Sequence, residues 1–124
     1  MKFTRTIKKN GDFVRVYKNG RHYAGKHLIL HVSGGERDVN ALGVSVGRKY
    51  GKSVRRNYLK RVIKENYREI EDFVGTGFMF VFAARAAGDA PRPDYYDIRR
   101  EIGGLFRRAG VLDRQRWDES QKKA

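Results

Sequence analysis

SVRRNYLKRVIKENYREIEDFVGTGFMFVFAARA, residues 53–86, joins two patterns that decide the fold class. The first is helical, because a rotation of about 100° per residue gathers five apolar side chains into one arc of about 100°. They are Leu59, Val62, Ile63, Ile70 and Phe73. The pattern predicts a helix from a Ser53 N-cap to about Asp72, ended by Gly75 and Gly77. The second pattern, residues 78–86, is a short apolar and aromatic run, which predicts a central strand buried on both faces.

Further elements are predicted on either side of this stretch. Residues 11–20 have apolar residues at near-helical spacing, with Asp12 as a candidate N-cap. Strands are predicted at 26–32 and 40–51, a hairpin loop at 34–40, a loop at 87–94 and a last helix at 94–110. The order helix, strands, helix, strand, helix predicts an α/β two-layer sandwich with a small mixed sheet.

The chain has 124 residues, the size of one domain, and we expect a single domain over 1–124. Its ordered core is expected at about 8–110, followed by a polar tail at 111–124 that frays. The 28 basic residues exceed the 14 acidic ones, for a net charge of +14. Because such an excess repels itself in a compact state, a polyanionic partner is expected.

The absence of cysteine excludes a disulfide framework and a thiol nucleophile, and it suits the reducing cytoplasm. The first residues lack the apolar run of a secretory signal. The longest apolar stretch, residues 78–84, is too short to span a bilayer. A cytoplasmic protein without a membrane partner is therefore expected.

Basic residues form a second arc on the long helix, about 140° wide and interrupted by Tyr67 and Glu71. Residues 48–68 hold nine Lys and Arg against one acid, Glu65. Because the basic residues cluster both in the sequence and on the helical wheel, they predict a phosphate-binding surface. The amide of Asn57 lies among them and adds a neutral hydrogen-bond donor and acceptor. The candidate nucleic-acid contacts are Arg48, Lys49, Lys52, Arg56, Asn57, Lys60, Arg61, Lys64 and Arg68.

Two arginines stand at the start of this helix, where the helix dipole disfavours cations. The wheel places Arg56 in the basic arc and Arg55 on the apolar side, so the two need not share one role. We assign Arg56 to nucleic acid and leave Arg55 open.

The segment GRKYGKSVRRNYLKRVIKENYR, residues 47–68, resembles the signature region of the protein component of bacterial ribonuclease P. That family carries an Arg-Asn-Arg-x-Lys-Arg pattern on a long helix, after a strand ending in Ser-Val and a Lys/Gly-rich turn. RNYLKR at 56–61 matches the pattern except at Tyr58, and the resemblance extends over about residues 8–110. Contacts that the family makes through the second motif arginine are in doubt here.

The resemblance implies a catalytic RNA subunit and precursor tRNA as partners, with no obligate protein partner. It implies that the basic helix faces the catalytic RNA. Phe13 and Tyr17 match the aromatic positions of a cleft for the single-stranded 5′ leader. It also implies a left-handed strand–helix–strand crossover, whereas spacing alone favours a right-handed one. Mg²⁺, held mainly by the RNA and substrate phosphates, is the expected cofactor.

The residues themselves support the leader cleft weakly. Phe13 and Tyr17 lie four apart and are flanked by cations, which suits stacking on unpaired bases. Without the resemblance, the same spacing favours two core residues of an amphipathic helix.

We find no catalytic or metal-ligating constellation in the sequence. His22, His27 and His31 are scattered around one predicted strand, and Asp94 and Asp97 suit helix caps. Cleavage is therefore expected from the RNA.

Two alternatives stay open at this point. A structural RNA-binding protein of the ribosomal type needs no more than the basic helix and the net charge. A DNA-binding regulator is disfavoured, because no short helix precedes the candidate recognition helix.

Overall fold

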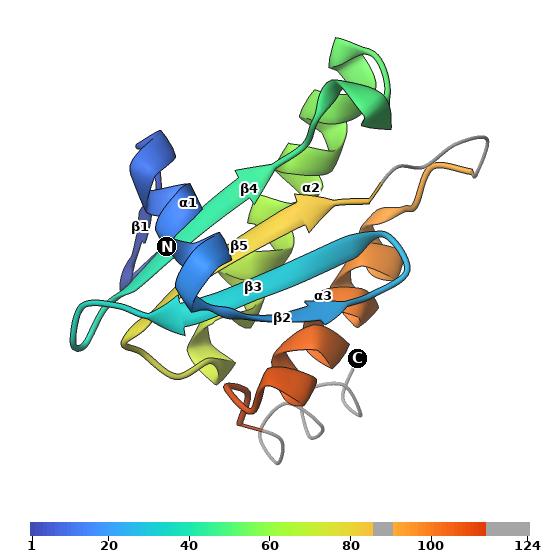
Figure 1. Ribbon diagram of the computed structural model, residues 1–124. Coiled ribbons are helices and arrows are strands. Elements are labelled where there is room, and N and C mark those ends of the chain that lie inside the picture. The colour runs from blue at the N-terminus through green and yellow to red at the C-terminus, as the bar shows by residue number, and fades with distance from the viewer. Residues whose placement is uncertain (86–90, 114–124) are drawn as a thin grey trace.

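The computed structural model describes residues 1–85 and 91–113. It is a mixed five-stranded sheet with three α-helices (Figure 1). The elements are β1 (Thr4–Thr6), α1 (Asn10–Asn19), β2 (Arg21–Ala24), β3 (Leu28–Gly34), β4 (Asn40–Ser45), the 3₁₀ turn η1 (Arg48–Tyr50), α2 (Ser53–Ile70), the 3₁₀ turn η2 (Glu71–Phe73), β5 (Phe78–Ala84) and α3 (Tyr95–Ala109).

The strands lie in the order β1-β4-β5-β3-β2. β5 is the central strand, parallel to β4 and antiparallel to β3, and residues 79–82 are buried, as the apolar run predicts. β1 adds to β4 in parallel, and β2 adds to β3 in antiparallel orientation. The predicted hairpin at 34–40 is wrong. In a hairpin β3 and β4 would pair with each other, whereas here β5 lies between them and pairs with both.

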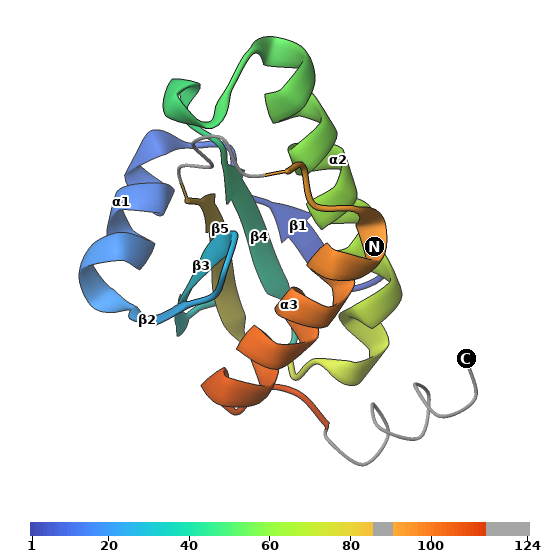
Figure 2. The same cartoon turned by 90° about the vertical axis from the view of Figure 1, so that its right-hand side faces the viewer.

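Helices α2 and α3 cover one face of the sheet, and the short helix α1 lies on the other (Figure 2). The predicted sandwich with a mixed sheet is thus confirmed. The main core lies under α2 and α3, where Phe80 and Phe82 of β5 contact the Phe106 ring at centroid distances of 4.9 and 5.5 Å. A smaller cluster around Val16 and Val81 lies under α1.

The β4–α2–β5 crossover is left-handed. Seen from the side of α2, with the strands pointing upward, β5 lies to the left of β4 (Figures 1 and 2). Side-chain volume accounts for the face that α2 takes. Leu42 and Phe80 lie in the core under α2, whereas Ala41, Gly43, Met79 and Val81 lie on the α1 side. The buried leucine and phenylalanine side chains of β3, β4 and β5 thus pack against the long helix. The right-handed form that spacing favours is wrong.

Several helix and strand ends differ from the prediction. Lys9, not Asp12, is the N-cap of α1, and Lys52, not Ser53, is the N-cap of α2; neither cap makes a side-chain hydrogen bond. Asp94 and Asp97 do form a capping box at the start of α3. The predicted strand at 40–51 ends at Ser45, because the chain turns into η1.

The packed chain also extends past the predicted core of 8–110. β1 begins at Thr4, and Val111 and Leu112 are buried, with Leu112 in an isolated bridge to Val74. The rest of the predicted tail, residues 114–124, lies outside the described residues, as does the first half of the predicted loop at 87–94.

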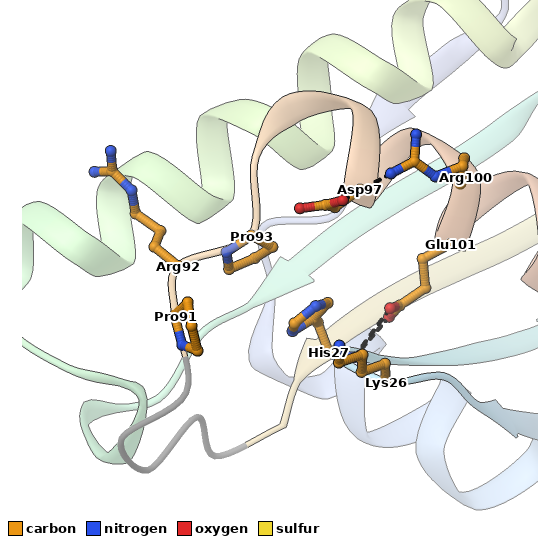
Figure 3. A pocket seen from close by; sticks show the side chains of 8 residues that line it. All are labelled: Lys26, His27, Pro91, Arg92, Pro93, Asp97, Arg100 and Glu101. Atoms are coloured by element: carbon orange, nitrogen blue, oxygen red, sulfur yellow. Dashed lines mark hydrogen bonds and ion pairs between the residues drawn. The ribbon is translucent and has the colours of Figure 1, made fainter.

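Helix α3 holds the turn between β2 and β3 through one carboxylate. Glu101 accepts hydrogen bonds from the backbone N–H group of His27, at 3.0 and 2.9 Å (Figure 3), and from that of Leu28, at 2.6 Å. The carboxylate thereby satisfies two strand-end donors, and the edge strand β2 is fixed to the helical layer.

Candidate RNA interface

The candidate RNA contacts lie on one continuous stretch, from η1 through α2. Leu59, Val62 and Ile63 on the opposite side of α2 are buried, as the wheel predicts. Arg56 and Lys60 are half-buried, and the remaining members are exposed: Arg48, Lys49, Lys52, Asn57, Arg61, Lys64 and Arg68. The ion pair between Arg61 and Glu65, 3.9 Å apart, is exposed and therefore contributes little. The cations remain available to a polyanion.

The two interruptions of the basic arc are the positions at which the start of the chain covers the C-terminal part of α2. Tyr67 and Glu71 lie in the arc but are buried, with exposed fractions of 0% and 2%. The Tyr67 hydroxyl lies 2.7 Å from Thr4 Oγ1, and Glu71 accepts hydrogen bonds from the backbone N–H groups of Lys2 and Phe3. β1 therefore covers this end of α2, a contact that no helical periodicity reveals.

The two arginines at the start of α2 do have different surroundings. The Arg55 guanidinium lies over the Tyr50 ring, with Cζ 5.1 Å from its centroid, so Arg55 packs against η1. Arg56 Nη2 donates a hydrogen bond to Ser53 Oγ at 3.2 Å, on the exposed side of the first turn. This arrangement favours Arg56 over Arg55 as an RNA contact.

A pocket of about 300 Å³ lies between α1, the end of β4 and α2. Its lining includes both predicted leader residues, Phe13 and Tyr17, and also Lys60 from the basic helix; the others are Asn10, Val44, Ser45 and Val46. Phe13 is half-buried, and 40% of Tyr17 is exposed, whereas their neighbour Val16 is fully buried. Two aromatic rings and an ammonium group thus face one recess, which suits the bases and phosphates of a single strand.

His31 of β3 is a candidate site residue that the sequence interpretation left out. Its ring contacts that of Tyr17 edge to face, with centroids 4.7 Å apart, and the ring of His22 lies 6.0 Å away. Burial, and secondarily the charge of His22, lowers the pKa of His31. Strand alternation was the available signal, because it sets His31 on the face opposite Leu30 and Val32, the face that α1 covers.

Tyr58, the departure from the family pattern, packs against the main core. Its hydroxyl donates to the carbonyl of Pro93 at 3.4 Å, and two guanidinium groups approach its ring. Arg92 Cζ lies 4.1 Å and Arg61 Cζ 5.6 Å from the ring centroid.

The described residues hold no group of three or more His, Asp or Glu side chains able to bind a metal ion. Over the same residues, no helix combines the length and apolarity that crossing a membrane requires.

Comparison with known proteins finds relatives along most of the chain. The family model described as Ribonuclease P matches residues 1–110. The ribonuclease P protein component of Clostridium kluyveri is 42% identical over 107 residues, covering 85% of this chain and 94% of the relative. That of Clostridioides difficile is 37% identical over 115 residues, covering 90% and 98%.

Solved structures agree as well. The RNase P protein of Staphylococcus aureus superposes with a TM-score of 0.75 at 28% identity, covering 86% of this chain and 96% of that one. The RNase P protein from Thermotoga maritima superposes with a TM-score of 0.75 at 27% identity, covering 84% of this chain and 96% of that one. Sequence and structure together show that this chain belongs to the ribonuclease P protein family.

Proposed function

We propose that this chain is the protein subunit of ribonuclease P and that it assists removal of the 5′ leader from precursor tRNA. The family match supports the subunit role and the partnership with the ribonuclease P RNA. In this proposal the surface from η1 through α2 binds that RNA, and the pocket at Phe13 and Tyr17 holds the single-stranded leader. The cytoplasmic location expected from the sequence stays a prediction.

The observation that carries the proposal is the pocket in which Lys60 meets Phe13 and Tyr17. A leader strand in this recess would lie beside an RNA bound along α2, so one protein would position the substrate against its partner. Holding the substrate in the reactive geometry lowers the entropic part of the activation barrier and so raises the rate of cleavage. The basic residues would also relieve the repulsion between two polyanions.

We assign the chemistry itself to the RNA. Mg²⁺ bound by RNA and substrate phosphates would activate a water molecule for attack on the phosphodiester. In this proposal the protein's part is binding and orientation of the substrate.

Reconstitution tests the proposal. The protein is added to the ribonuclease P RNA at low Mg²⁺, and cleavage of precursor tRNA is followed with a long leader and with a leader of one nucleotide. We expect the protein to raise kcat/KM, and to raise it more for the long leader. No gain in cleavage would reject the subunit role. An equal gain for both substrates would reject the leader pocket and favour a protein that only binds structured RNA.

A further inference from the structure

Two arginines from different elements flank the ring of Tyr58. Arg61 belongs to α2, whereas Arg92 lies in the segment that leads into α3. Arg92 lines the pocket at His27 and Glu101, and Figure 3 shows its guanidinium pointing toward α2 rather than toward those two side chains. At 4.1 Å from the ring centroid, Arg92 is within stacking distance.

Stacking leaves the hydrogen-bonding capacity of a guanidinium intact. The flat face of the group contacts the ring, while its N–H donors point outward in the plane of the group. An arginine held in this way is oriented before any ligand arrives, so less side-chain entropy is lost on binding. Arg92 is therefore a preorganised donor for a planar or tetrahedral anion.

The backbone around Arg92 is also held in place. Pro91 and Pro93 flank it, and proline restricts its own φ angle and the conformation of the residue before it. Pro93 is buried and accepts the hydrogen bond from the Tyr58 hydroxyl. Just beyond it, the carbonyl of Tyr95 accepts a hydrogen bond from the buried Asn66 amide at 3.0 Å. These contacts fix the segment to α2.

A recess of about 500 Å³ lies at this point, lined by Val54, Asn57, Tyr58, Arg61 and Arg92. No acidic side chain lines it, and within the described part of the chain the ion pairs include none with Arg92. Val54 is 79% exposed and Asn57 is exposed, so the recess is open to a large partner. Two cations, one amide and no carboxylate suit a phosphodiester.

We propose that Arg92, stacked on Tyr58, binds a backbone phosphate of the ribonuclease P RNA together with Arg61. The inference rests on the proposed function and extends its RNA surface from α2 onto the segment before α3. We name the catalytic RNA rather than precursor tRNA, because the recess adjoins the basic face of α2, whereas the leader pocket opens toward α1.

The test is the salt dependence of the affinity of the full chain for the ribonuclease P RNA alone. Arg92→Ala should weaken binding and lower the slope of log K against log salt by about 0.7 to 0.9, as expected for one lost phosphate contact. Arg37→Ala is the matched control, since it removes one exposed cation from the loop between β3 and β4. We expect wild-type affinity and slope for this control. Equal behaviour of the two variants would overturn the proposal.

Variants of Tyr58 test the stacking itself. Tyr58→Phe keeps the ring but removes the hydrogen bond to Pro93, so it should weaken RNA binding less than Tyr58→Leu, which removes the ring as well. In the Tyr58→Leu background, Arg92→Ala should cost less affinity than in the wild type, because the guanidinium is no longer aligned. Full additivity would overturn the role of Tyr58, and urea unfolding checks that each variant folds.

Two further arms separate this inference from the proposed function. If Arg56→Ala and Lys60→Ala weaken RNA binding while Arg92→Ala does not, only the inference fails; if none of the three does, the proposed RNA surface fails. If Arg92→Ala instead leaves binding to the RNA intact and weakens binding of precursor tRNA to the reconstituted enzyme, the phosphate belongs to the substrate and the assignment to the catalytic RNA is overturned.

Discussion

Gly43 has no side chain, and the Phe13 ring occupies the space that a side chain would need. A Cβ at this position of β4 would lie 2.6 Å from Phe13 Cε1 and 3.3 Å from Ile7 Cβ. The ring can therefore approach the backbone of β4 closely, at one wall of the pocket that it shares with Tyr17 and Lys60. The shape of the proposed leader site therefore depends on the absence of a side chain at Gly43 of β4.

Gly43→Ala should displace the Phe13 ring and reduce the effect of the leader. We expect kcat/KM for a long-leader precursor to fall toward that for a short-leader one, with unchanged affinity for the ribonuclease P RNA. Gly34→Ala is the control, because a Cβ there meets nothing within 4 Å. An unaltered leader effect in Gly43→Ala would show that Phe13 does not shape the leader site.

His31 should make stability depend on pH. Its folded-state pKa is lowered, by burial first and by His22 second, so between that pKa and the ordinary value of 6.5 the unfolded chain binds more protons. Stability should therefore rise with pH across this window and be lost as the pH falls through it. His31→Gln should show a smaller difference between urea midpoints at about pH 5.5 and about pH 7.5. An equal difference in wild type and variant would contradict the assignment.

At the scale of elements, a buried carboxylate helps to attach the first strand to the long helix. Glu71, at the end of α2, is 2% exposed and accepts hydrogen bonds from the backbone of Lys2 and Phe3 and from the Thr4 hydroxyl. β1 has only three residues and pairs with β4 alone. Its place at the edge of the sheet therefore depends on Glu71 as much as on strand pairing.

Glu71→Ala should lower the free energy of unfolding by about 1–3 kcal/mol, because it leaves buried donors without an acceptor. Glu36→Ala is the comparison, since it removes only an exposed ion pair with Arg5, worth less than about 1 kcal/mol. Urea denaturation of both variants measures the difference. Equal losses would mean that Glu71 does not anchor β1.

The long elements could be predicted from sequence, whereas the short ones could not. The helix expected from Ser53 to about Asp72 is observed as α2 and η2, because its apolar residues repeat over several turns. β1 and β2 have three and four residues, too few for a clear alternation, and they pair through backbone groups that any sequence provides. Strand order was also out of reach, since β3 and β4 are neighbours in the chain but not in the sheet.

The same distinction holds for the candidate site. The basic face follows from spacing within one helix, so its members could be named from the wheel. Lys60 and Phe13 line one pocket because the end of β4 lies between α1 and α2. Arg92 contacts Tyr58 although the two residues are 34 positions apart in the sequence. Contacts of this kind arise from topology, which periodicity does not encode.

For the whole molecule, the uneven placement of a net charge of +14 is the main electrostatic feature. A net charge of +8 lies within residues 48–68, on η1 and α2. Self-repulsion in this region opposes folding, and bound RNA would relieve it. RNA binding should therefore be strongly dependent on salt.

Replacement of Arg56, Lys60 and Arg61 by alanine should lower RNA affinity and flatten its salt dependence. Each lost phosphate contact should reduce the log–log slope by about 0.7 to 0.9. The control is a second triple variant, in which Arg5, Lys26 and Arg37 become alanine and which therefore has the same total charge as the first. It should keep the wild-type slope. The same slope in both variants would mean that the basic face is only solvated.

The position of β5 constrains how a growing chain can fold on the ribosome. β3 and β4 flank β5 in the finished sheet, so their inner edges stay unpaired until residues 78–84 have been synthesised. More than two thirds of this chain must emerge before its sheet can close. A nascent chain arrested before Phe78 would display two open strand edges, the feature most prone to aggregation. Early arrest products of this protein should therefore depend on chaperones.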